Sequence, residues 1–417
     1  MVHVVDSENP ALSVIGLGYI GLPTAVAFAL NGWDVTGVDV NQGVVDLIND
    51  GILPFEEANM EDALNEVLKA GSFRAQTDQR PADVYIIAVP TPFHLDKTAD
   101  LSYIQAAAEA IGPLVKDGDL VVLESTSPPG TTEKMAQWVE TTSPTEAQGV
   151  MYAHAPERVL PGRIMVEIVD NDRIVGGLTP EATKRARDVY ASFCLGQIHT
   201  TDARTAELSK LAENSFRDVN IAFANELSVI CDGLGIDVWE LISLANRHPR
   251  VEILQPGPGV GGHCIAVDPW FVVEAAPEAS DLIRTARRVN DAKPAWVTKK
   301  IKAVVDASPQ SSVSLFGLAF KPNIDDLRES PAVEIAFELA SQLPNTTIRL
   351  VEPHVAALPE GLQKLDNVEL VSIEEALDSS DVVVLLVDHN IFLEIEPARL
   401  DGKTVIDTRG KWSSCSS

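Results

Sequence analysis

The sequence contains no apolar run that approaches the roughly 18 to 20 residues that a membrane-spanning helix needs. It also lacks the basic start and long apolar stretch of a signal peptide, because acidic residues stand in its opening segment, MVHVVDSENP. A membrane segment is therefore not expected, and we predict a cytoplasmic protein.

Positive charge is scarce. The chain has 32 Lys and Arg against 61 Asp and Glu, which gives a formal net charge of −29. A field of this sign repels phosphate backbones and anionic lipid surfaces, so nucleic acid and membranes are not expected as partners. An anionic small molecule stays possible where a few cations gather inside a cleft.

Cysteine is also rare, and its spacing excludes two classes of protein. The four cysteines are scattered without a CxxC pair, so neither a disulfide framework nor a metal site is expected. Cys194 and Cys231 stand in apolar surroundings typical of inert core residues, and Cys415 lies in the polar tail WSSCSS. Cys264 lacks such apolar surroundings.

The 417 residues are 45% hydrophobic, enough for two or three packed domains. Apolar runs alternate with segments of helical composition in both terminal parts of the chain, which predicts parallel sheets covered on both faces. From about Thr205 to Val305 the strand signals nearly vanish, and apolar residues keep helical spacing for over 25 positions there. The expected strands are residues 12–15, 34–40, 84–89, 120–124, 173–177, 313–320, 347–353, 382–388 and 404–410.

The predicted fold class is therefore α/β, with two Rossmann-like doubly wound parallel-sheet domains joined by a central helical domain with a long spine helix. We expect the boundaries at 1–204, 205–305 and 306–417.

A glycine motif follows the first predicted strand. Gly16, Gly18 and Gly21 form GxGxxG at the mouth of a helix, and Asp39 ends the next strand. In this context Gly16 permits a tight turn, Gly18 lets a pyrophosphate approach the backbone, and Gly21 allows close packing of helix and strand. An acidic residue at Asp39 accepts hydrogen bonds from both ribose hydroxyls and repels a 2′-phosphate, which predicts NAD rather than NADP. The alternative is a set of glycines needed only for a tight turn.

A second glycine-rich loop, GPGVGGHCIAVDPW, carries Cys264 beside His263 and four residues before Asp268. This composition does not suit an ordinary helix or strand, and it brings the backbone close to a ligand. We therefore predict that Cys264 is a reactive thiol.

The long central helix places Lys210 and Asn214 four residues apart and hence on one face. Arg217 lies on the same stripe and offers a cation for an anionic substrate. The alternative for Lys210 is a solvated surface lysine.

Four segments together resemble the UDP-glucose/GDP-mannose dehydrogenase family: GLGYIG followed by VD, KLAEN, GPGVGGHCIAVDP and GLAFKPNIDDLRESPA. The resemblance covers nearly the whole chain. It implies an NAD-binding domain, a helical centre that builds a homodimer, and a C-terminal UDP-sugar domain.

Within that family the chain is most similar to the UDP-N-acetyl-D-mannosamine 6-dehydrogenases, in HCIAVDPWF, NRHPRVEILQPGPGVGG and APERVLPGR. The UDP-glucose enzymes have other residues where Arg158, Pro161, Ala266 and Val267 stand here. These departures argue against UDP-glucose as the substrate.

The resemblance implies oxidation of the sugar C6 alcohol to a carboxylate with two NAD⁺, for surface polysaccharide precursors. Cys264 would form a thiohemiacetal and then a thioester. Lys210 and Asp268 would handle protons and order the water, Asn214 would stabilise the oxyanion, and Glu157 would assist hydrolysis.

The remaining implied site residues fall into two groups. Those implied to contact NAD, besides the glycines, are Ile20, Asp39, Thr91, Thr126, Lys321 and Arg328. Those implied to contact the UDP-sugar, besides Lys210 and Asn214, are Arg158, Val159, Arg217, His248, Arg250 and Gly261, with Arg250 reaching across the dimer.

Three alternatives stay open. A UDP-N-acetylglucosamine 6-dehydrogenase would differ mainly by proline and isoleucine at positions 266 and 267. A one-hydride β-hydroxyacid-type dehydrogenase also carries a lysine and an asparagine four apart, but it needs no thiol. A non-catalytic sensor of NAD or a nucleotide-sugar would have no use for a nucleophile.

Overall fold

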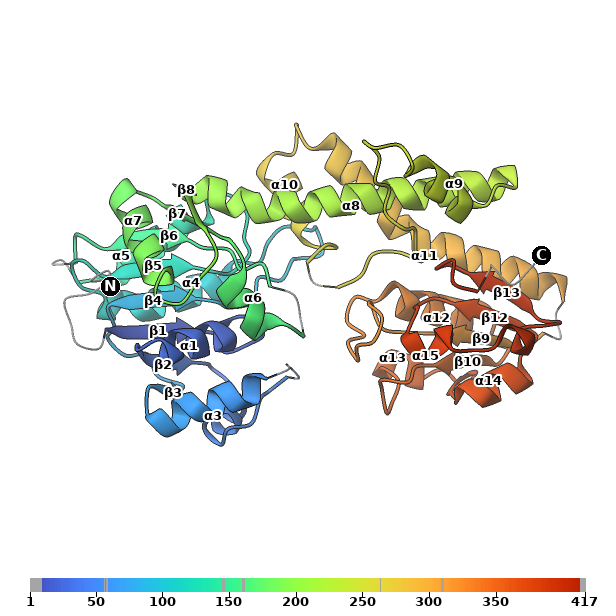
Figure 1. Cartoon of the computed structure of the whole chain (residues 1–417), viewed down its shortest axis with the longest axis horizontal. Coiled ribbons are helices and arrows are strands. Elements are labelled where there is room, and N and C mark those ends of the chain that lie inside the picture. Colours follow the sequence, from blue (N-terminus) through green and yellow to red (C-terminus); the bar gives the residue numbers. More distant parts are fainter. Residues whose placement is uncertain are drawn as a thin grey trace. The chain divides into compact units, whose positions relative to one another are not determined.

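The computed structural model describes residues 10–412 except 56, 58, 145–146, 160–161, 263 and 309–310. It divides into two compact units (Figure 1). Unit 1 contains the chain up to Glu213 together with Trp270–Pro277, and unit 2 contains Asn214–Pro269 and the chain from Glu278 onward. Within the described part of the chain, no helix is both long and apolar enough to cross a membrane. The three-domain division stays a prediction.

Unit 1 is built on an eight-stranded sheet of order β3-β2-β1-β4-β5-β6-β7-β8. Neighbouring strands are parallel except for β6 and β7, which pair antiparallel. The strands are β1 (Ala11–Ile15), β2 (Asp34–Val38), β3 (Phe73–Gln76), β4 (Val84–Ile87), β5 (Leu120–Leu123), β6 (Met151–His154), β7 (Arg173–Gly177) and β8 (Ile198–Asp202).

Both faces of this sheet are buried, which explains its continuous apolar strands. In β4, Val84 and Ile86 pack into one hydrophobic cluster and Tyr85 and Ile87 pack into another. Helices cover the two faces, as the doubly wound prediction requires. The helical segments that lie entirely within this unit are α1 (Gly21–Leu30), α2 (Gln42–Asn49), α3 (Met60–Ala70), α4 (Ser102–Ile111), η1 (Gly112–Leu114), α5 (Thr131–Thr142), α6 (Ile164–Asp170) and α7 (Pro180–Tyr190).

The long central helix is confirmed as α8 (Ala203–Leu234), which has 32 residues. The division between the units passes through α8 and through α10 (Asp268–Ala275). The other central helices are α9 (Val238–Ala245) and α11 (Asp281–Ala307).

Unit 2 carries a five-stranded parallel sheet of order β11-β10-β9-β12-β13. This order repeats that of β3-β2-β1-β4-β5 in unit 1, and β12 likewise sends alternate residues into two hydrophobic clusters. Its strands are β9 (Val313–Phe316), β10 (Ile348–Val351), β11 (Val368–Leu370), β12 (Val382–Leu385) and β13 (Thr404–Asp407). Its helical segments beyond α11 are α12 (Pro331–Gln342), α13 (Glu360–Gln363), α14 (Ile373–Ser379), α15 (Asn390–Leu393) and η2 (Pro397–Arg399).

Candidate active site

The three glycines of the turn between β1 and α1 have different structural roles. Gly16 has φ +94°, and a Cβ there would lie 2.6 Å from the Ala88 carbonyl oxygen. A Cβ on Gly21 would lie 1.8 Å from the Gly16 oxygen, so only glycine fits at this packing point. Gly18 is exposed, and a Cβ there would have no neighbour within 4 Å. The space in front of Gly18 and the start of α1 suits a phosphate group.

Asp39 stands directly after β2 at the mouth of this turn. Its Oδ2 accepts a hydrogen bond from the Leu17 N–H at 3.0 Å, and its Oδ1 accepts one from the Asn41 N–H at 2.9 Å. The half-buried carboxylate therefore pins the glycine turn while its edge stays open to a ligand. These residues fit an NAD ribose and pyrophosphate.

The other predicted cofactor contacts of unit 1 lie near the ends of strands. Thr126 is half-buried beyond β5, and Ile20 is half-buried just before α1. The Thr91 hydroxyl is buried and has no hydrogen-bond partner within the described residues. A buried unsatisfied hydroxyl is costly, so an approaching ligand atom would satisfy it.

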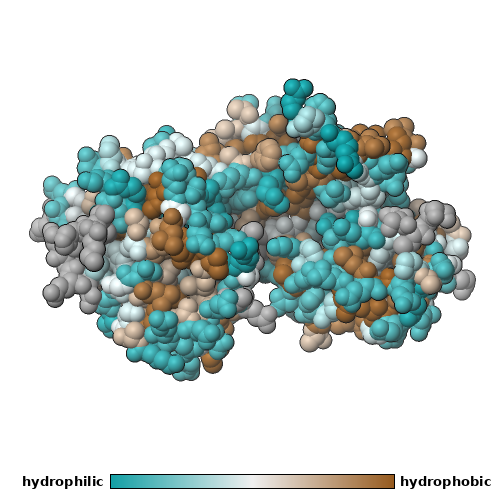
Figure 2. Space-filling view, viewed as in Figure 1, coloured by the Kyte–Doolittle hydropathy of each residue, from teal (hydrophilic) through white to brown (hydrophobic). Residues whose placement is uncertain are grey.

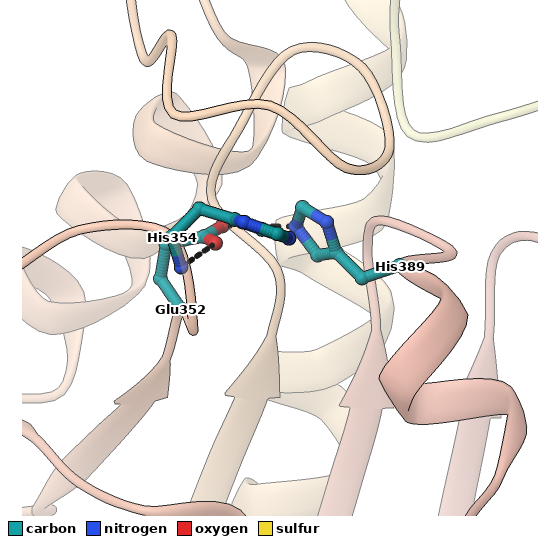
Figure 3. Close-up of side chains that lie close together, drawn as sticks. All are labelled: Glu352, His354 and His389. Atoms are coloured by element: carbon teal, nitrogen blue, oxygen red, sulfur yellow. Dashed lines mark hydrogen bonds and ion pairs between the residues drawn. The ribbon is translucent and has the colours of Figure 1, made fainter.

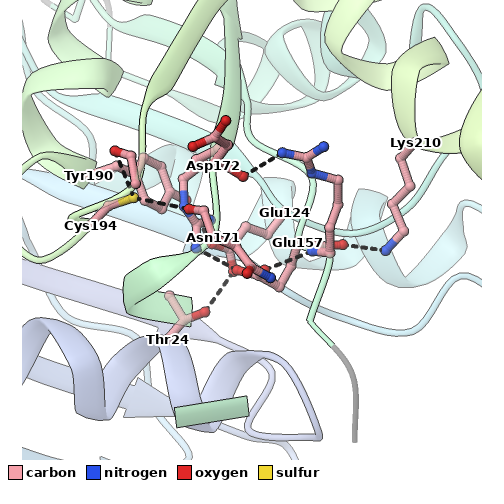
Figure 4. A network of polar contacts seen from close by, with 11 residues as sticks. Thr24, Glu124, Glu157, Asn171, Asp172, Tyr190, Cys194 and Lys210 are labelled. Carbon is pink, nitrogen blue, oxygen red and sulfur yellow. Dashed lines mark hydrogen bonds and ion pairs between the residues drawn. The ribbon is translucent and has the colours of Figure 1, made fainter. Parts of the chain in front are cut away.

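A buried polar network lies behind these strand ends (Figure 4). Arg173, which is 4% exposed, pairs with Glu157 at 2.5 Å and with Glu124 at 3.6 Å. Glu124 accepts further hydrogen bonds from Thr24 at 3.0 Å and Tyr190 at 2.8 Å. Burial raises the pKa of the Glu124 carboxyl above its ordinary value, and Arg173 opposes that rise. One guanidinium therefore serves two buried carboxyl groups.

Glu157 connects this network to Lys210 (Figure 4). The Lys210 ammonium donates to the Glu157 main-chain carbonyl at 2.5 Å, while the Glu157 side chain accepts from Arg173 and from the Arg158 N–H. His154, at the end of β6, is buried, and this burial together with the Lys210 charge lowers its pKa to about 3. Lys210 therefore faces a neutral imidazole and a carbonyl rather than a carboxylate.

Glu207 fixes the start of α8, which sequence reasoning missed. Its carboxylate accepts from the Gly130 N–H at 2.6 Å and from the Thr132 N–H and hydroxyl at 2.7 and 2.6 Å, at the start of α5. Lys210 follows one helical turn later. No local pattern signals this contact, because the partners are more than 70 residues apart.

Two predicted substrate residues of unit 1 have protein partners. The Arg158 guanidinium pairs with Glu213 at 2.8 Å and donates to the Asp172 carbonyl. Val159 packs against the core of this unit. Pro161 lies outside the described residues.

In unit 2, the glycine loop ends at an exposed thiol. Cys264 is exposed, whereas Cys194 and Cys231 are buried as expected. The Asp268 N–H donates to the Cys264 carbonyl at 2.8 Å, and the Asp268 carboxylate, which is 3% exposed, accepts from the Asn214 amide at 2.6 Å. The predicted residues Cys264, Asp268 and Asn214 are thus brought together. Lys210 belongs to unit 1, so its pairing with Asp268 stays a prediction.

A chain of buried polar side chains holds the start of this loop. The Gly257 N–H donates to Asn225, whose amide donates to Asn290, both at 2.9 Å. Asn290 in turn donates to Asp218 at 2.8 Å, and Asp218 pairs with buried Arg287. Sequence reasoning missed this chain as well, since its members are buried polar residues on two helices.

The remaining predicted residues of unit 2 are mostly exposed. Arg217, His248, Arg250 and Lys321 are exposed, and the Arg250 N–H donates to His248 Nδ1 at 3.3 Å. Arg328 forms a forked pair with Asp326 at 2.9 and 2.6 Å. Gly261 is held by close packing described below, and His263 lies outside the described residues. Their ligand contacts stay predictions.

Three models of the UDP-glucose/GDP-mannose dehydrogenase family match the chain: the NAD binding domain over residues 11–194, the central domain over 204–292 and the UDP binding domain over 314–414. The chain is 53% identical, over 99% of both sequences, to an NDP-N-acetyl-D-galactosaminuronic acid dehydrogenase of Ralstonia nicotianae. It is 52% identical, over 96% of its length and 99% of the relative, to a UDP-N-acetyl-D-mannosamine dehydrogenase of Escherichia coli.

The solved structure of a UDP-N-acetyl-mannosamine dehydrogenase from S. aureus is 41% identical with a TM-score of 0.85, covering 98% of this chain and 96% of that one. The corresponding enzyme of Pyrococcus horikoshii is 38% identical with a TM-score of 0.85, covering 96% of each chain. The chain therefore belongs to the UDP-glucose/GDP-mannose dehydrogenase family and is an NAD-dependent nucleotide-sugar dehydrogenase.

Proposed function

We propose that the protein oxidises C6 of UDP-N-acetyl-D-mannosamine to the uronate through a thioester on Cys264. The observation that carries this proposal is the exposed Cys264 at the end of a glycine-rich loop, with its carbonyl bound by the N–H of Asp268. Relatives and solved structures named for this activity share 52% and 41% identity with the chain, which supports the choice of sugar.

The reaction needs a residue that retains the half-oxidised sugar. Bound NAD⁺ would supply the oxidising power by accepting a hydride from C6 in each of two steps. After the first step, the Cys264 thiolate attacks the aldehyde carbon to give a thiohemiacetal, and loss of the second hydride leaves a thioester. Water then cleaves the C–S bond, which restores the thiol and releases the carboxylate. One alcohol, two NAD⁺ and one water thus give one carboxylate, two NADH and three protons.

The other predicted catalytic residues have proposed roles that complement Cys264. Asp268 orders the attacking water, and its carboxylate is itself fixed by the Asn214 amide at 2.6 Å. Lys210 and Asn214 stabilise the negative oxygen of each tetrahedral adduct. Glu157 holds the Lys210 ammonium through its carbonyl, while its carboxylate stays paired with Arg173.

The predicted cations supply the charge that a UDP-sugar needs. Arg158, Arg217, His248 and Arg250 are proposed to bind the diphosphate and sugar, with Val159 and Gly261 as neighbouring contacts. Lys321 and Arg328 are proposed to contact NAD. Guanidinium groups suit phosphates because they donate two hydrogen bonds in a plane.

A second candidate substrate is the corresponding N-acetylgalactosamine nucleotide. The Ralstonia relative with 53% identity over 99% of both chains carries that uronic acid in its name, which favours it. The two sugars differ in configuration at C2 and C4, whereas the oxidised C6 is common to both.

The test measures NADH formed per sugar with UDP-N-acetylmannosamine, UDP-N-acetylgalactosamine, UDP-N-acetylglucosamine and UDP-glucose. We expect two NADH per sugar and the highest kcat/KM with UDP-N-acetylmannosamine. Cys264→Ala should lose uronate formation, while Cys231→Ala, at a buried cysteine, serves as the matched control. One NADH per sugar, or full activity in Cys264→Ala, would contradict the proposal.

We also propose a homodimer that forms through α8. Phe216, Phe223 and Ile230, spaced by seven residues, are 70%, 51% and 47% exposed, and Leu234 is 67% exposed. Figure 2 shows hydrophobic surface over this part of the helical region. Monomers rarely leave so long an apolar stripe exposed, and a second copy of α8 would bury it.

A further inference from the structure

Glu352 and His389 form a buried pair at the strand ends of unit 2 (Figure 3). Glu352 follows β10 and is 4% exposed, and His389 precedes α15 and is fully buried. His389 Nε2 lies 3.0 Å from Glu352 Oε2. The same oxygen accepts from the Leu318 N–H at 2.7 Å and the Ala319 N–H at 3.0 Å.

With His354, this pair places three metal-ligand side chains within 4.8 Å of one another. The hydrogen bonds argue against a metal. His389 Nδ1 accepts from the Asn323 N–H at 2.9 Å, so its proton lies on Nε2, which donates to Glu352. His389 therefore has no lone pair left for an ion, and Glu352 Oε2 already accepts three donors.

The pair instead fixes the segment that follows β9. It binds the N–H groups of Leu318, Ala319 and Asn323, so this irregular backbone is held at three points. Burial by itself raises the pKa of a carboxyl, but the bonds from His389 and Leu318 outweigh it and lower the pKa of Glu352. Glu352 thus stays an anion that can accept all of these bonds.

The fixed segment packs against the cysteine loop. A Cβ on Gly261 would lie 2.5 Å from the Glu329 oxygen and 3.0 Å from the Phe320 Cβ. A Cβ on Gly262, where φ is +84°, would lie 2.9 Å from the Phe320 ring. Cys264 follows two residues later, so the position of Phe320 limits where its backbone can lie.

We propose that Glu352 and His389 are positioning residues for Cys264, acting through the Leu318–Asn323 backbone and the contact of Phe320 with Gly261 and Gly262. The catalytic consequence rests on the proposed role of Cys264. A nucleophile displaced by about 1 Å can lose on the order of 10²-fold in rate. The pair therefore contributes to catalysis without touching the substrate.

The test measures the rate at which iodoacetamide alkylates Cys264 in the unliganded protein, by mass spectrometry of the peptide that contains it. For Glu352→Ala we expect a change of about fivefold or more in that rate and a drop in kcat of about tenfold or more. Glu352→Gln keeps an oxygen for the backbone donors, so we expect it to restore both rates to within about threefold of wild type.

His354→Ala is the matched control, because the exposed His354 ring lies 4.8 Å from the His389 ring but is not among the side chains that bind the N–H groups of Leu318, Ala319 and Asn323. We expect it, and treatment with EDTA, to leave both rates unchanged. Unchanged alkylation and kcat in folded Glu352→Ala would overturn the proposal, and so would loss of activity with EDTA, since that indicates a metal.

If Glu352→Ala fails to fold, the alkylation rate is measured in Phe320→Ala instead. This variant removes the contact between the two loops and leaves the Glu352–His389 pair intact. Unchanged alkylation in that variant also overturns the proposal. The proposed thioester mechanism is tested separately, because retained uronate formation in Cys264→Ala would contradict that mechanism alone. The alkylation rate of Cys264 reports the position of the loop whichever group is the nucleophile.

Discussion

Replacing Arg173 with methionine would leave two buried carboxyl groups without their cation. Glu157 and Glu124 are 5% and 2% exposed, and Arg173 lies 2.5 and 3.6 Å from them. Breaking a buried ion pair from one side costs about 3–5 kcal/mol. The guanidinium also lies over the Tyr190 ring at 4.6 Å, a contact that methionine replaces only in part.

The sign of the pH dependence follows from the carboxyl groups. Burial already raises the pKa of Glu124 in the wild type, and without Arg173 we expect the pKa of this carboxyl to rise further. Groups with a raised folded pKa destabilise the fold above that pKa and cease to do so once they are protonated. The stability difference between wild type and Arg173→Met should therefore shrink as the pH falls from 8 to about 5.5.

Thermal unfolding followed by circular dichroism measures this difference. For a unit of this size, about 3–5 kcal/mol corresponds to a Tm lower by roughly 6–20 °C at pH 8. Arg74→Met is the control, because its ion pair with Asp34 is 42% exposed on each side and should contribute about 1 kcal/mol or less. A loss as small as that of the control, or one that does not change with pH, would refute the reasoning.

Three further predictions use other parts of the structure. Gly18→Ala should fold normally and weaken NAD⁺ binding about tenfold or more, seen as a higher KM for NAD⁺. Gly21→Ala should lower Tm instead, because its Cβ would lie 1.8 Å from the Gly16 oxygen. Equal Tm values for the two variants would contradict this assignment. Burial lowers the pKa of Lys293 from 10.5 to about 8, so the protein is less stable below pH 8, where the buried ammonium is charged, and its stability rises between pH 8 and 10.5. This rise amounts to ~3 kcal/mol at most, and the free energy of unfolding of Lys293→Met, measured in urea, should lack it. Phe223→Asp should halve the mass measured by light scattering if α8 forms the dimer, and an unchanged mass would count against that interface.

Much of the fold could be predicted from sequence because its main strands are buried on both faces. Runs such as VYIIAV and VVVLLVD are continuously apolar, so they can be predicted as buried strands from the sequence alone. Four strands were missed: β3, β6, β8 and β11. All four are short; β3, β8 and β11 are partly exposed, with sequences such as FRAQ and IHTTD, and β6 has only the four residues MYAH. The run expected over 313–320 ends at Phe316, because Gly317 has φ +91° and turns the chain.

The candidate site shows the same limit. The glycine turn and the cysteine loop are local in sequence, so their residue types and spacing predicted them. Arg173, Glu207 and the Glu352–His389 pair depend on partners that lie 16 to 77 residues away, and no periodicity connects such positions. These buried polar contacts could therefore be identified only from the three-dimensional structure.

Asp39 has both a structural role and a proposed role in coenzyme choice, and this has a consequence for coenzyme engineering. The carboxylate expected to reject the extra phosphate of NADP also accepts the Leu17 N–H at 3.0 Å. A designer who removes it to broaden coenzyme use would also loosen the neighbouring backbone, and the binding of both dinucleotides would suffer. Asparagine is the better starting substitution, because it discards the charge and keeps an oxygen for that N–H.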